Sequence, residues 1–454
     1  MAIATIDPVT GTTIETFCEM DPARIDGIVR EAHDRSRTWR TTPIDRRAVF
    51  VRNAGRALLE SRDELALLMA EEMGKPVTEG RAEIEKCTRA CDHYAEHAER
   101  YLTREDVATQ HTRAYVVFEP LGVVLGVMPW NFPFWQVFRF AVPAIMAGNV
   151  ALLKHASNVP RVALAIERVF AAASFPPGVF QTLIVGNARV RDLVEHPLVA
   201  AVTLTGSSAA GAAVAADAGR MIKKTVLELG GSDPYLVLDD ADLDRAAAVC
   251  AAARLVNAGQ SCIAGKRFIV VEQVAEAFLS RFVDAMRSKR VGDPKDEATE
   301  IGPLARHDLR DALHRQVEES VARGATLVLG GKVPAGPGAF YPPTVLTHVR
   351  PGMPVYDDEV FGPVAAVLVA RDEDDAVRIA NDSRFGLGAA VFTEKRARGE
   401  AVARQLDAGA VFVNAQVVSD PRLPFGGIKA SGYGRELGAL GIKEFVNAKT
   451  IVVA

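Results

Sequence analysis

The sequence predicts an α/β protein with two Rossmann-like parallel-sheet domains and a small additional sheet. Short apolar segments alternate with helical segments from residue 123 to 231, and again from 232 to about 412. This alternation is typical of parallel sheets that are covered by helices on both faces. The chain has 454 residues, which is too long for one hydrophobic core, so two or three domains are expected.

The first hundred residues are predicted to be helical, because residues 21–104 carry apolar side chains at three- and four-residue spacing. An isolated strand is predicted at 114–118. The first parallel sheet should then contain strands at 123–128, 150–154, 180–185, 201–205 and 224–228, with helices at 134–146, 161–173 and 208–218 between them. Pro133 stands at a position that favours the start of the first of these helices.

The second block is predicted to contain strands at 268–271, 365–369 and 389–392. Glycine and proline cluster at 330–343, which indicates a surface loop. The chain ends on an apolar strand at 450–453. That strand and the isolated one at 114–118 are edges that need covering.

Composition and charge exclude some classes of partner. The chain is 49% hydrophobic and 24% charged, as ordinary globular proteins are, and its formal net charge is -4. A nucleic-acid partner usually requires a basic face, so none is expected. There is no apolar run of eighteen residues and no charged-then-apolar leader, so we expect a soluble cytoplasmic protein without a membrane partner. The five cysteines lack paired zinc-ligand spacing, so neither a metal nor a disulfide framework is expected.

One cysteine occurs in a more informative context. Cys262 lies in the run 257–267 (NAGQSCIAGKR), downstream of Glu228 in the run 227–231 (LELGG). A deprotonated thiol is a natural nucleophile toward an aldehyde carbonyl, and a carboxylate can take a proton from the thiol and later from water. A lone cysteine or glutamate is more often structural, so the pairing needs support from other motifs.

Two further motifs supply that support: residues 129–133 (PWNFP) and 359–363 (EVFGP). With these motifs in this order, the chain resembles the aldehyde dehydrogenase superfamily from about residue 5 to the C-terminus. The resemblance implies the aldehyde dehydrogenase fold, with three kinds of segment. These are a cofactor-binding domain (1–106 and 123–231), a catalytic domain (232–412), and bridging segments (107–122 and 413–454) that join subunits into a homodimer or homotetramer.

The resemblance also implies the catalytic roles. The Cys262 thiolate would form a thiohemiacetal and then a thioester. The side-chain amide of Asn131 and the backbone N–H of Cys262 would hold the oxyanion. Glu228 would activate the water that hydrolyses the thioester to a carboxylic acid. Relatives that transfer the acyl group to coenzyme A generally lack this glutamate, so hydrolysis is expected.

A nicotinamide dinucleotide is the expected cofactor. Gly206 and Ser207 lie between a predicted strand and a helix, whose first N–H groups suit a pyrophosphate. By resemblance, Lys154 would contact the adenosine ribose. Ser157 stands where many NAD-using relatives carry a glutamate, and a hydroxyl there accommodates a 2′-phosphate, which favours NADP over NAD. The nicotinamide end would be lined by Trp130, Glu359 and Phe361, again by resemblance.

Three residues point to the substrate. Arg139, two helical turns after Asn131, is expected to face the entry tunnel, where an unpaired arginine is costly unless an anion binds; the alternative is a surface or ion-paired arginine. Ser419 could donate to a carboxylate, and Arg422 is a further cation that could instead face solvent. Together they favour a short aldehyde with a terminal carboxylate.

The runs 154–160, 228–234 and 420–427 are similar to those of bacterial succinate-semialdehyde dehydrogenases that prefer NADP, which implies succinate as the product. Two alternatives stay open. One is a broader aldehyde dehydrogenase that acts on glutarate semialdehyde or medium-chain aldehydes. The other is a binding protein with the same fold, which the loss of Cys262, Glu228 or Asn131 would have indicated; all three residues are present.

Overall fold

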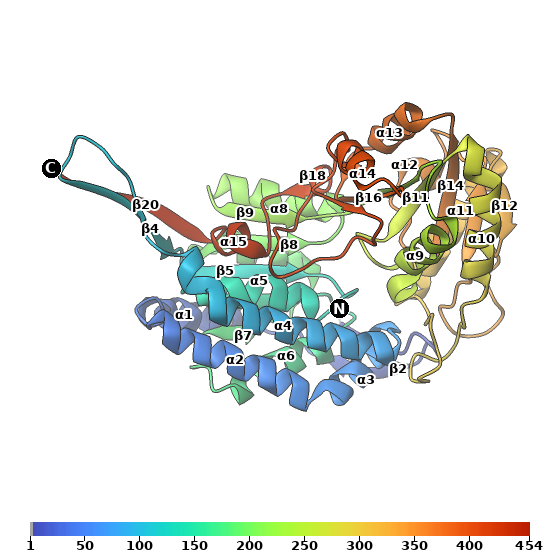
Figure 1. The fold of residues 1–454 in the computed structure, drawn as a ribbon. Helices are drawn as coiled ribbons and strands as arrows, with labels where there is room; N and C mark the ends of the chain where they lie inside the picture. The colour runs from blue at the N-terminus through green and yellow to red at the C-terminus, as the bar shows by residue number, and fades with distance from the viewer. Residues whose placement is uncertain (1–2) are drawn as a thin grey trace.

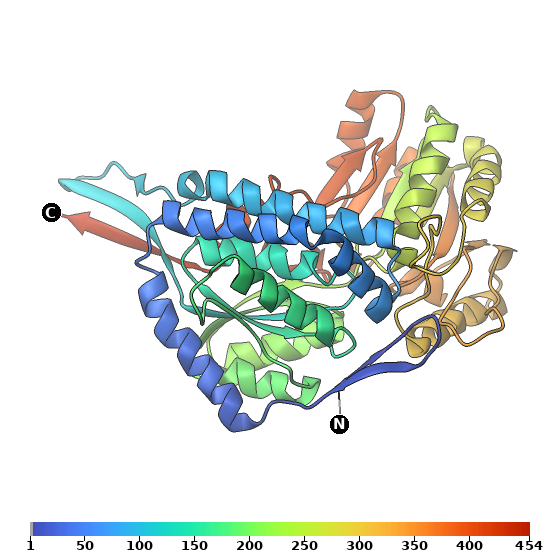
Figure 2. The same cartoon turned by 90° about the horizontal axis from the view of Figure 1, so that it is seen from below.

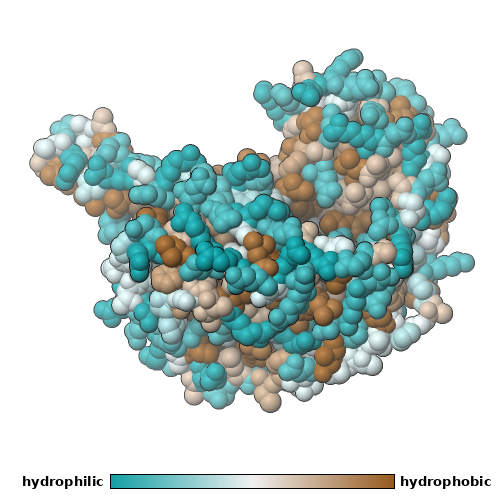
Figure 3. Space-filling view, turned by 60° about the horizontal axis from the view of Figure 1, so that its bottom comes forward, coloured by the Kyte–Doolittle hydropathy of each residue, from teal (hydrophilic) through white to brown (hydrophobic). Residues whose placement is uncertain are grey.

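The computed structural model describes residues 3–454. Two α/β lobes make up the body of the molecule, and a thin arm that carries the C-terminus projects from the first lobe (Figure 1). Figure 3 shows a hollow between the two lobes on one face, with hydrophobic residues along the wall of the second lobe. The two-lobed α/β architecture confirms the predicted fold class.

The first lobe is built on a six-stranded sheet in the order β19-β9-β8-β5-β6-β7. Five of its strands are parallel, and only β19 is antiparallel. The strands are β5 (Val123–Met128), β6 (Val150–His155), β7 (Phe180–Thr182), β8 (Val199–Thr205), β9 (Lys224–Glu228) and β19 (Gly432–Tyr433). The five strands predicted from the sequence are therefore confirmed, with β7 shorter than expected.

Helices cover both faces of this sheet. The N-terminal helices are α1 (Pro22–Trp39), α2 (Ile44–Glu60), α3 (Arg62–Met73) and α4 (Val77–Tyr101), and the crossover helices are α5 (Trp135–Met146), α6 (Pro160–Ala172), α7 (Val190–Glu195) and α8 (Ser208–Arg220). The 25-residue helix α4 packs against α2, α3 and α5. Figure 2 shows α2 and α4, in blue, running alongside each other. The helices predicted within 21–104 are confirmed.

Residues 3–17 form an antiparallel hairpin, β1 (Ile3–Ile6) and β2 (Thr13–Phe17), which was not predicted. Ile3 and Thr5 are buried, and the Thr5 hydroxyl donates to Glu72 Oε1 over 2.5 Å. The hairpin is therefore anchored to the first lobe.

The second lobe is built on a seven-stranded sheet in the order β12-β13-β14-β11-β10-β16-β17. Its strands are β10 (Asp233–Val237), β11 (Gly265–Val271), β12 (Thr326–Leu329), β13 (Thr344–Thr347), β14 (Val364–Ala370), β16 (Gly388–Phe392) and β17 (Ala410–Val413). Its helices are α9 (Leu243–Leu255), α10 (Ala275–Arg287), α11 (His307–Ala322), α12 (Pro354–Asp357), α13 (Glu373–Asn381) and α14 (Arg396–Ala403). The three predicted strands are confirmed, and the predicted loop at 330–343 joins β12 to β13.

The arm is an antiparallel sheet of β3 (Glu105–Asp106), β4 (Arg113–Pro120) and β20 (Val446–Val453), in the order β20-β4-β3. The two predicted edge strands thus pair with each other along their length. The C-terminal segment also contains β18 (Ile428–Lys429), which pairs with β15 (Phe385–Gly386), and α15 (Gly438–Ile442). Because β19 joins the first sheet, residues 413–454 do more than form the arm.

Across residues 3–454, no helix combines the length and apolar character needed to cross a bilayer. Within the same residues, no three His, Cys, Asp or Glu side chains form a group that could hold a metal ion.

Candidate active site

Cys262 lies in the loop between α9 and β11, and the backbone of this loop is unusual. Asn257, Ala258 and Gly259 all have positive φ, at 52°, 53° and 75°. Left-handed backbone is costly for residues with a Cβ and persists only where the surroundings impose it. Gly259 has no room for a side chain, since a Cβ there would lie 2.2 Å from the carbonyl oxygen of Gly362. The loop is therefore held in one shape by close backbone packing.

Helix α4 fixes this loop and the start of α5 through two carboxylates on one of its faces, the half-buried Glu79 and the buried Glu83. Glu79 Oε2 accepts the backbone N–H of Asn257 over 2.8 Å. One turn later, Glu83 Oε1 accepts the backbone N–H groups of Phe134 and Trp135, each over 2.9 Å. A carboxylate at a helix N-terminus satisfies N–H groups that lack partners and is favoured by the helix dipole. One helix therefore positions both the loop that carries Cys262 and the start of α5, which follows Asn131.

Asn131 meets the cysteine loop directly. Its side chain is buried, and its Nδ2 donates to the carbonyl oxygen of Gln260 over 3.0 Å. The side chain of Asn257 in turn donates to the carbonyl oxygen of Asn131 over 2.7 Å. A carboxamide nitrogen has two N–H groups, so one remains to donate to another acceptor. The structure thus brings Asn131 to the loop of Cys262, as the sequence predicted.

Glu228 ends β9 and is buried, and neither of its carboxyl oxygens has a hydrogen-bond partner within the described part of the chain. Its segment touches the cysteine loop, because a Cβ at Gly231 would lie 2.6 Å from the carbonyl oxygen of Cys262. Burial raises the pKa of Glu228 well above its usual range, against the opposing charge of Arg139. Burial therefore favours the neutral form of this carboxyl group.

Burial also favours the neutral form of the Cys262 thiol. The residue is half-buried, and burial raises the pKa of its thiol to about 12, although the charges of Arg139 and Lys266 oppose this. Lys266 is buried behind the loop, and its Nζ donates to the carbonyl oxygens of Ser261 (3.0 Å) and Cys262 (2.7 Å). An additional positive charge beside the sulfur would lower the pKa of the thiol and favour the nucleophilic thiolate.

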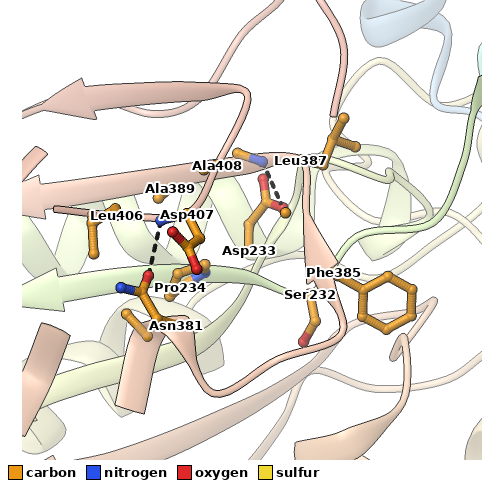
Figure 4. A pocket seen from close by; sticks show the side chains of 13 residues that line it. Ser232, Asp233, Pro234, Asn381, Phe385, Leu387, Ala389, Leu406, Asp407 and Ala408 are labelled. Atoms are coloured by element: carbon orange, nitrogen blue, oxygen red, sulfur yellow. Dashed lines mark hydrogen bonds between the residues drawn. The ribbon is translucent and has the colours of Figure 1, made fainter. Parts of the chain in front are cut away.

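A small pocket lies next to the glycines that follow Glu228, and Figure 4 shows Asp233 among the residues that line it. Asp233 Oδ1 accepts the backbone N–H of Gly388 over 3.1 Å, and Oδ2 has no partner among residues 3–454. Burial raises the pKa of Asp233 to about 7. This carboxyl group was not predicted from the sequence. It connects the start of β10, and therefore the segment at Gly231, to β16.

A cavity of about 850 Å³ opens between the N-terminal hairpin, the first lobe and residues 305–308 at the start of α11. The residues that line it include Glu19, Trp130, Ala156, Ser157, Asn158, Gly186, Asn187 and Ala188. Lys154, at the end of β6, donates from Nζ to Asn187 Oδ1 over 2.5 Å. Burial lowers the pKa of Lys154 to about 8, and the charge of Glu19 opposes that shift. Ser157 and Lys154 are thus beside one cavity, together with a carboxylate, Glu19, that was not predicted.

The residues predicted for the nicotinamide end lie nearer the catalytic loop. The rings of Trp130 and Phe361 are perpendicular, with centroids 5.8 Å apart. The Glu359 carboxyl accepts the backbone N–H of Gly231 over 3.0 Å and lies 4.0 Å from Lys266 Nζ. A carboxylate suits the hydroxyls of a nucleoside, and aromatic rings suit its flat ring.

The predicted pyrophosphate position is the start of α8. Ser207 is the N-cap residue, and its side chain accepts the backbone N–H of Ala210 over 3.2 Å. The backbone N–H of Gly206 donates to the carbonyl oxygen of Glu228 over 3.0 Å, which ties this turn to the catalytic strand. The exposed first turn of α8 retains N–H groups for an anion. A lysine, hydroxyls and a helix start at one end, with a carboxylate and aromatic rings at the other, fit a dinucleotide.

Arg139 corrects one expectation. The prediction of an unpaired arginine is wrong, because Arg139 forms an ion pair with Glu436, and both side chains are buried. Its Nη2 also donates to Thr205 Oγ1 over 3.3 Å, and its guanidinium lies 4.7 Å from the ring centroid of Phe425. A buried charge needs a partner, and Glu436, far away in the sequence, supplies it. A role for Arg139 in binding substrate stays a prediction.

Ser419 and Arg422 have different environments. Ser419 is buried, and its Oγ accepts hydrogen bonds from Lys86 Nζ (2.7 Å) and Trp135 Nε1 (3.0 Å). Arg422 is exposed and pairs with Asp420, so it faces solvent. Lys86 was not predicted from the sequence, since a single lysine on an amphipathic helix carries no motif.

The sequence was compared with protein families and with known proteins. The model described as the aldehyde dehydrogenase family matches residues 1–451. A probable succinate-semialdehyde dehydrogenase (NADP+) from Synechocystis sp. is 50% identical over 454 residues and covers 100% of both chains. A succinate semialdehyde dehydrogenase (NAD(P)+) from Escherichia coli K12 is 47% identical over 446 residues, which is 98% of this chain and 96% of that protein.

Solved structures share the fold. The crystal structure of succinic semialdehyde dehydrogenase from Streptococcus pyogenes in complex with NADP+ is 36% identical, with a TM-score of 0.98 and complete coverage of both chains. Since the family match spans nearly the whole chain and a relative half identical to it covers its full length, this protein belongs to the aldehyde dehydrogenase family.

Proposed function

We propose that this enzyme oxidises succinate semialdehyde to succinate with NADP. The observation that carries the proposal is the contact between the two proposed catalytic segments. Gly231 lies against the carbonyl of Cys262, and the Glu228 carboxyl is buried without a hydrogen-bond partner among residues 3–454. A carboxyl group held in this way is available to a substrate or a water. The names of relatives that are 47% and 50% identical over nearly the full chain support the substrate and the cofactor.

The chain's residues divide the chemistry among them. The Cys262 sulfur attacks the aldehyde carbon, and the free N–H of the Asn131 side chain, with the backbone N–H of Cys262, donates to the oxygen that becomes negative. A bound nicotinamide dinucleotide supplies the hydride acceptor. Oxidation leaves a thioester on Cys262. Glu228 then takes a proton from water, the resulting hydroxide attacks the thioester carbon, and succinate leaves as the Cys262 thiol is restored.

The two lobes would serve different steps. We propose that residues 1–106 and 123–231 bind the cofactor and that residues 232–412 form the catalytic domain. The position of Ser157 and Lys154 on the first-lobe side of the cavity supports this, as does the position of Cys262 three residues before β11 of the second lobe.

The substrate and cofactor are tested by steady-state kinetics. We expect kcat/KM to be higher for succinate semialdehyde than for glutarate semialdehyde or hexanal, and higher with NADP than with NAD. Equal rates on hexanal and succinate semialdehyde would replace the proposal with a general aldehyde dehydrogenase.

The Ser157→Glu variant should shift the cofactor preference from NADP toward NAD. A carboxylate near the 2′-phosphate adds like-charge repulsion of about 1–3 kcal/mol when partly desolvated. The ratio of kcat/KM with NADP to that with NAD should therefore fall roughly ten- to a hundredfold. Ser157→Gln is the matched control, because it adds the same bulk without the charge and should move the ratio far less. If both variants changed the ratio equally, bulk rather than charge would be the cause.

We propose that the three-stranded sheet of the arm joins subunits. The arm projects from the body (Figure 1), and Val107, Val452 and Val453 expose 49%, 49% and 40% of their surface on it. Exposed valines on an edge sheet are typical of a surface that another chain covers. Analytical ultracentrifugation should give a mass of two or four times 48.7 kDa. A monomer at micromolar concentration would contradict this proposal.

A further inference from the structure

Lys266 is the second residue of β11, and the cysteine loop curls around its side chain. The side chain is buried, with 1% of its surface exposed. Its Nζ donates to three backbone carbonyl oxygens, those of Ser261 (3.0 Å), Cys262 (2.7 Å) and Ala264 (3.3 Å). All three belong to residues within five positions of Lys266 along the chain. The strand that follows the loop therefore binds the loop's own backbone.

The number of hydrogen bonds indicates that Lys266 is charged. An ammonium group has three N–H donors, whereas a neutral amine has two and would turn its lone pair toward the third carbonyl oxygen. Burial lowers the pKa of Lys266, but the carboxyl groups of Glu359 and Asp233 oppose that shift. Among residues 3–454, only the Glu359 carboxyl comes within 4.0 Å of Nζ. Three carbonyl oxygens and a nearby carboxylate suit the ammonium form.

The contact with Ser261 determines the direction of one N–H group. The carbonyl of Ser261 and the N–H of Cys262 belong to the same peptide group, and in a trans peptide the two point in opposite directions. Because Lys266 binds this carbonyl, the Cys262 N–H points away from the lysine. Within the described chain that N–H donates to no acceptor. It is therefore free to donate to an oxygen of a bound substrate.

Two further buried side chains hold the neighbouring peptide groups. Asn131 Nδ2 donates to the carbonyl oxygen of Gln260 over 3.0 Å. Arg254 is fully buried, and its Nη2 donates to the carbonyl oxygen of Gly259 over 2.6 Å. Four consecutive carbonyl oxygens, at 259–262, thus accept hydrogen bonds from buried side chains. The backbone on the N-terminal side of the sulfur is fixed, and Lys266 makes two of these contacts.

The charged groups that face the Cys262 thiol come from four elements. Burial raises the pKa of the thiol, Arg139 and Lys266 oppose this, and Glu359 and Asp233 add to it. Arg139 forms a close ion pair with a buried carboxyl group, whereas Lys266 lies 4.0 Å from its nearest one. Lys266 is therefore the less compensated of the two cations, and its charge favours the thiolate.

We propose that Lys266 is a positioning residue that directs the Cys262 N–H toward the substrate oxygen and stabilises the Cys262 thiolate. This inference rests on the proposed role of Cys262 as the nucleophile. Both effects have one cause, because the ammonium group binds the two peptide groups that flank Cys262. A cation that binds a carbonyl oxygen also polarises the peptide, which makes its N–H a stronger donor. Lys266 acts through the loop and not by contact with the substrate.

The first test measures the thiol. Full-length enzyme is alkylated with iodoacetamide at a series of pH values, and mass spectrometry of the Cys262 peptide follows the reaction, which requires the thiolate. In Lys266→Met, which keeps the length of the side chain, the pH midpoint should rise by about one unit or more. The alkylation rate below the midpoint should therefore fall roughly tenfold or more. Lys266→Gln, which keeps a donor without the charge, should show a similar rise.

The second test measures the chemical step. With NADP-loaded enzyme in excess over aldehyde, stopped-flow absorbance gives the rate of NADPH formation in a single turnover, which is then divided by the thiolate fraction from the first test. Loss of an oxyanion donor costs about 10²–10³-fold, and a misdirected donor should cost less. Lys266→Met should thus be slower roughly ten- to a hundredfold. Lys266→Gln should recover part of the rate, because its amide can still bind a carbonyl.

The matched control is Lys332→Met, which removes an exposed lysine in the loop 330–343 and should change neither the pH midpoint nor the single-turnover rate. Thermal unfolding and NADP binding are measured for each variant, so that rates refer to folded enzyme. If Lys266→Met does not fold, the rise of the midpoint in Lys266→Gln decides the outcome.

The outcomes separate the two proposals. If Cys262→Ala keeps its activity, the proposed function fails. If Cys262 is required but folded Lys266→Met keeps the pH midpoint and the single-turnover rate, the role of Lys266 is overturned, even if the Tm is lower. A change in only one of the two readouts overturns the joint role. A higher midpoint in both variants, with partial recovery of the rate in Lys266→Gln, supports the inference.

Discussion

Cys262→Ala should abolish dehydrogenase activity, with a loss of at least roughly a thousandfold in kcat, as expected when a covalent nucleophile is removed. Cys87, Cys91 and Cys250 are buried, with pKa values raised by burial, and Cys18 is exposed. None of them lies in the segments that meet at Glu228 and Asn131. No other thiol can therefore replace Cys262.

The measurement is the rate of NADPH formation with saturating succinate semialdehyde. NADP binding, followed by calorimetry, should be retained, because the variant removes one sulfur atom and leaves the cavity beside Ser157 and Lys154 unchanged. Cys18→Ala is the matched control and should keep full activity, since that side chain is exposed. Turnover by Cys262→Ala above a percent or so of the unmodified rate would rule out a covalent mechanism at this residue.

Glu228→Gln should leave the first turnover largely intact and slow the second. The substitution is nearly isosteric, and the carboxyl oxygens that it replaces make no hydrogen bonds within the described chain. What it removes is the base that takes a proton from water, and general-base catalysis typically contributes about 10²–10⁴-fold. Stopped-flow absorbance should therefore show a burst of NADPH of about one equivalent per active site, followed by a steady state that is slower by that factor.

The control for this variant is Glu276→Gln, an exposed residue in the first turn of α10, which should give no burst and normal turnover. Unchanged steady-state turnover in Glu228→Gln would exclude Glu228 as the essential base. A loss of the burst as well would assign it an earlier role, in deprotonating Cys262.

Glu228→Gln should also change how the rate of thioester hydrolysis and the folding stability depend on pH. Burial raises the pKa of Glu228, so the fraction present as carboxylate grows as pH rises. Thioester hydrolysis in the unmodified enzyme should therefore accelerate with pH, and the Gln variant should lack this acceleration. The folding stability of the unmodified enzyme should instead fall as pH rises. A folded-state pKa above the unfolded value of about 4.3 means that this group's contribution to stability is lost as pH rises above that value. The Tm advantage of Glu228→Gln should consequently grow from pH 5 to pH 8.

Several parts of the site were predictable because they are encoded locally. The run around Cys262 combines a thiol with glycines, which suit a tight loop. The run around Glu228 ends in two glycines, and the second of them, Gly231, packs against the carbonyl of Cys262. Strands β5 and β9 match the predicted ranges, because buried parallel strands are continuous apolar runs.

Other parts depend on residues far apart in the sequence. The unpaired state expected of Arg139 was wrong because its partner, Glu436, comes from near the end of the chain and is brought there by the pairing of β19 with β9. Glu19 and Lys86 gave no local signal. Glu19 lines the cavity beside Ser157, and Lys86 contacts Ser419, which is distant in the sequence. Both contacts exist only in the folded chain.

The sequence by itself determined the α/β class and the order of the strands along the chain, and it singled out the residues proposed as nucleophile, base and oxyanion donor, because apolar periodicity and short motifs depend on neighbouring residues. Only the tertiary structure decided which charges are paired. Arg139 is neutralised by Glu436, Arg422 by Asp420, and Lys86 is left with a serine and an indole. An ion pair depends on distances of a few ångströms between segments that folding alone brings together, and burial then determines what an unpaired charge can bind.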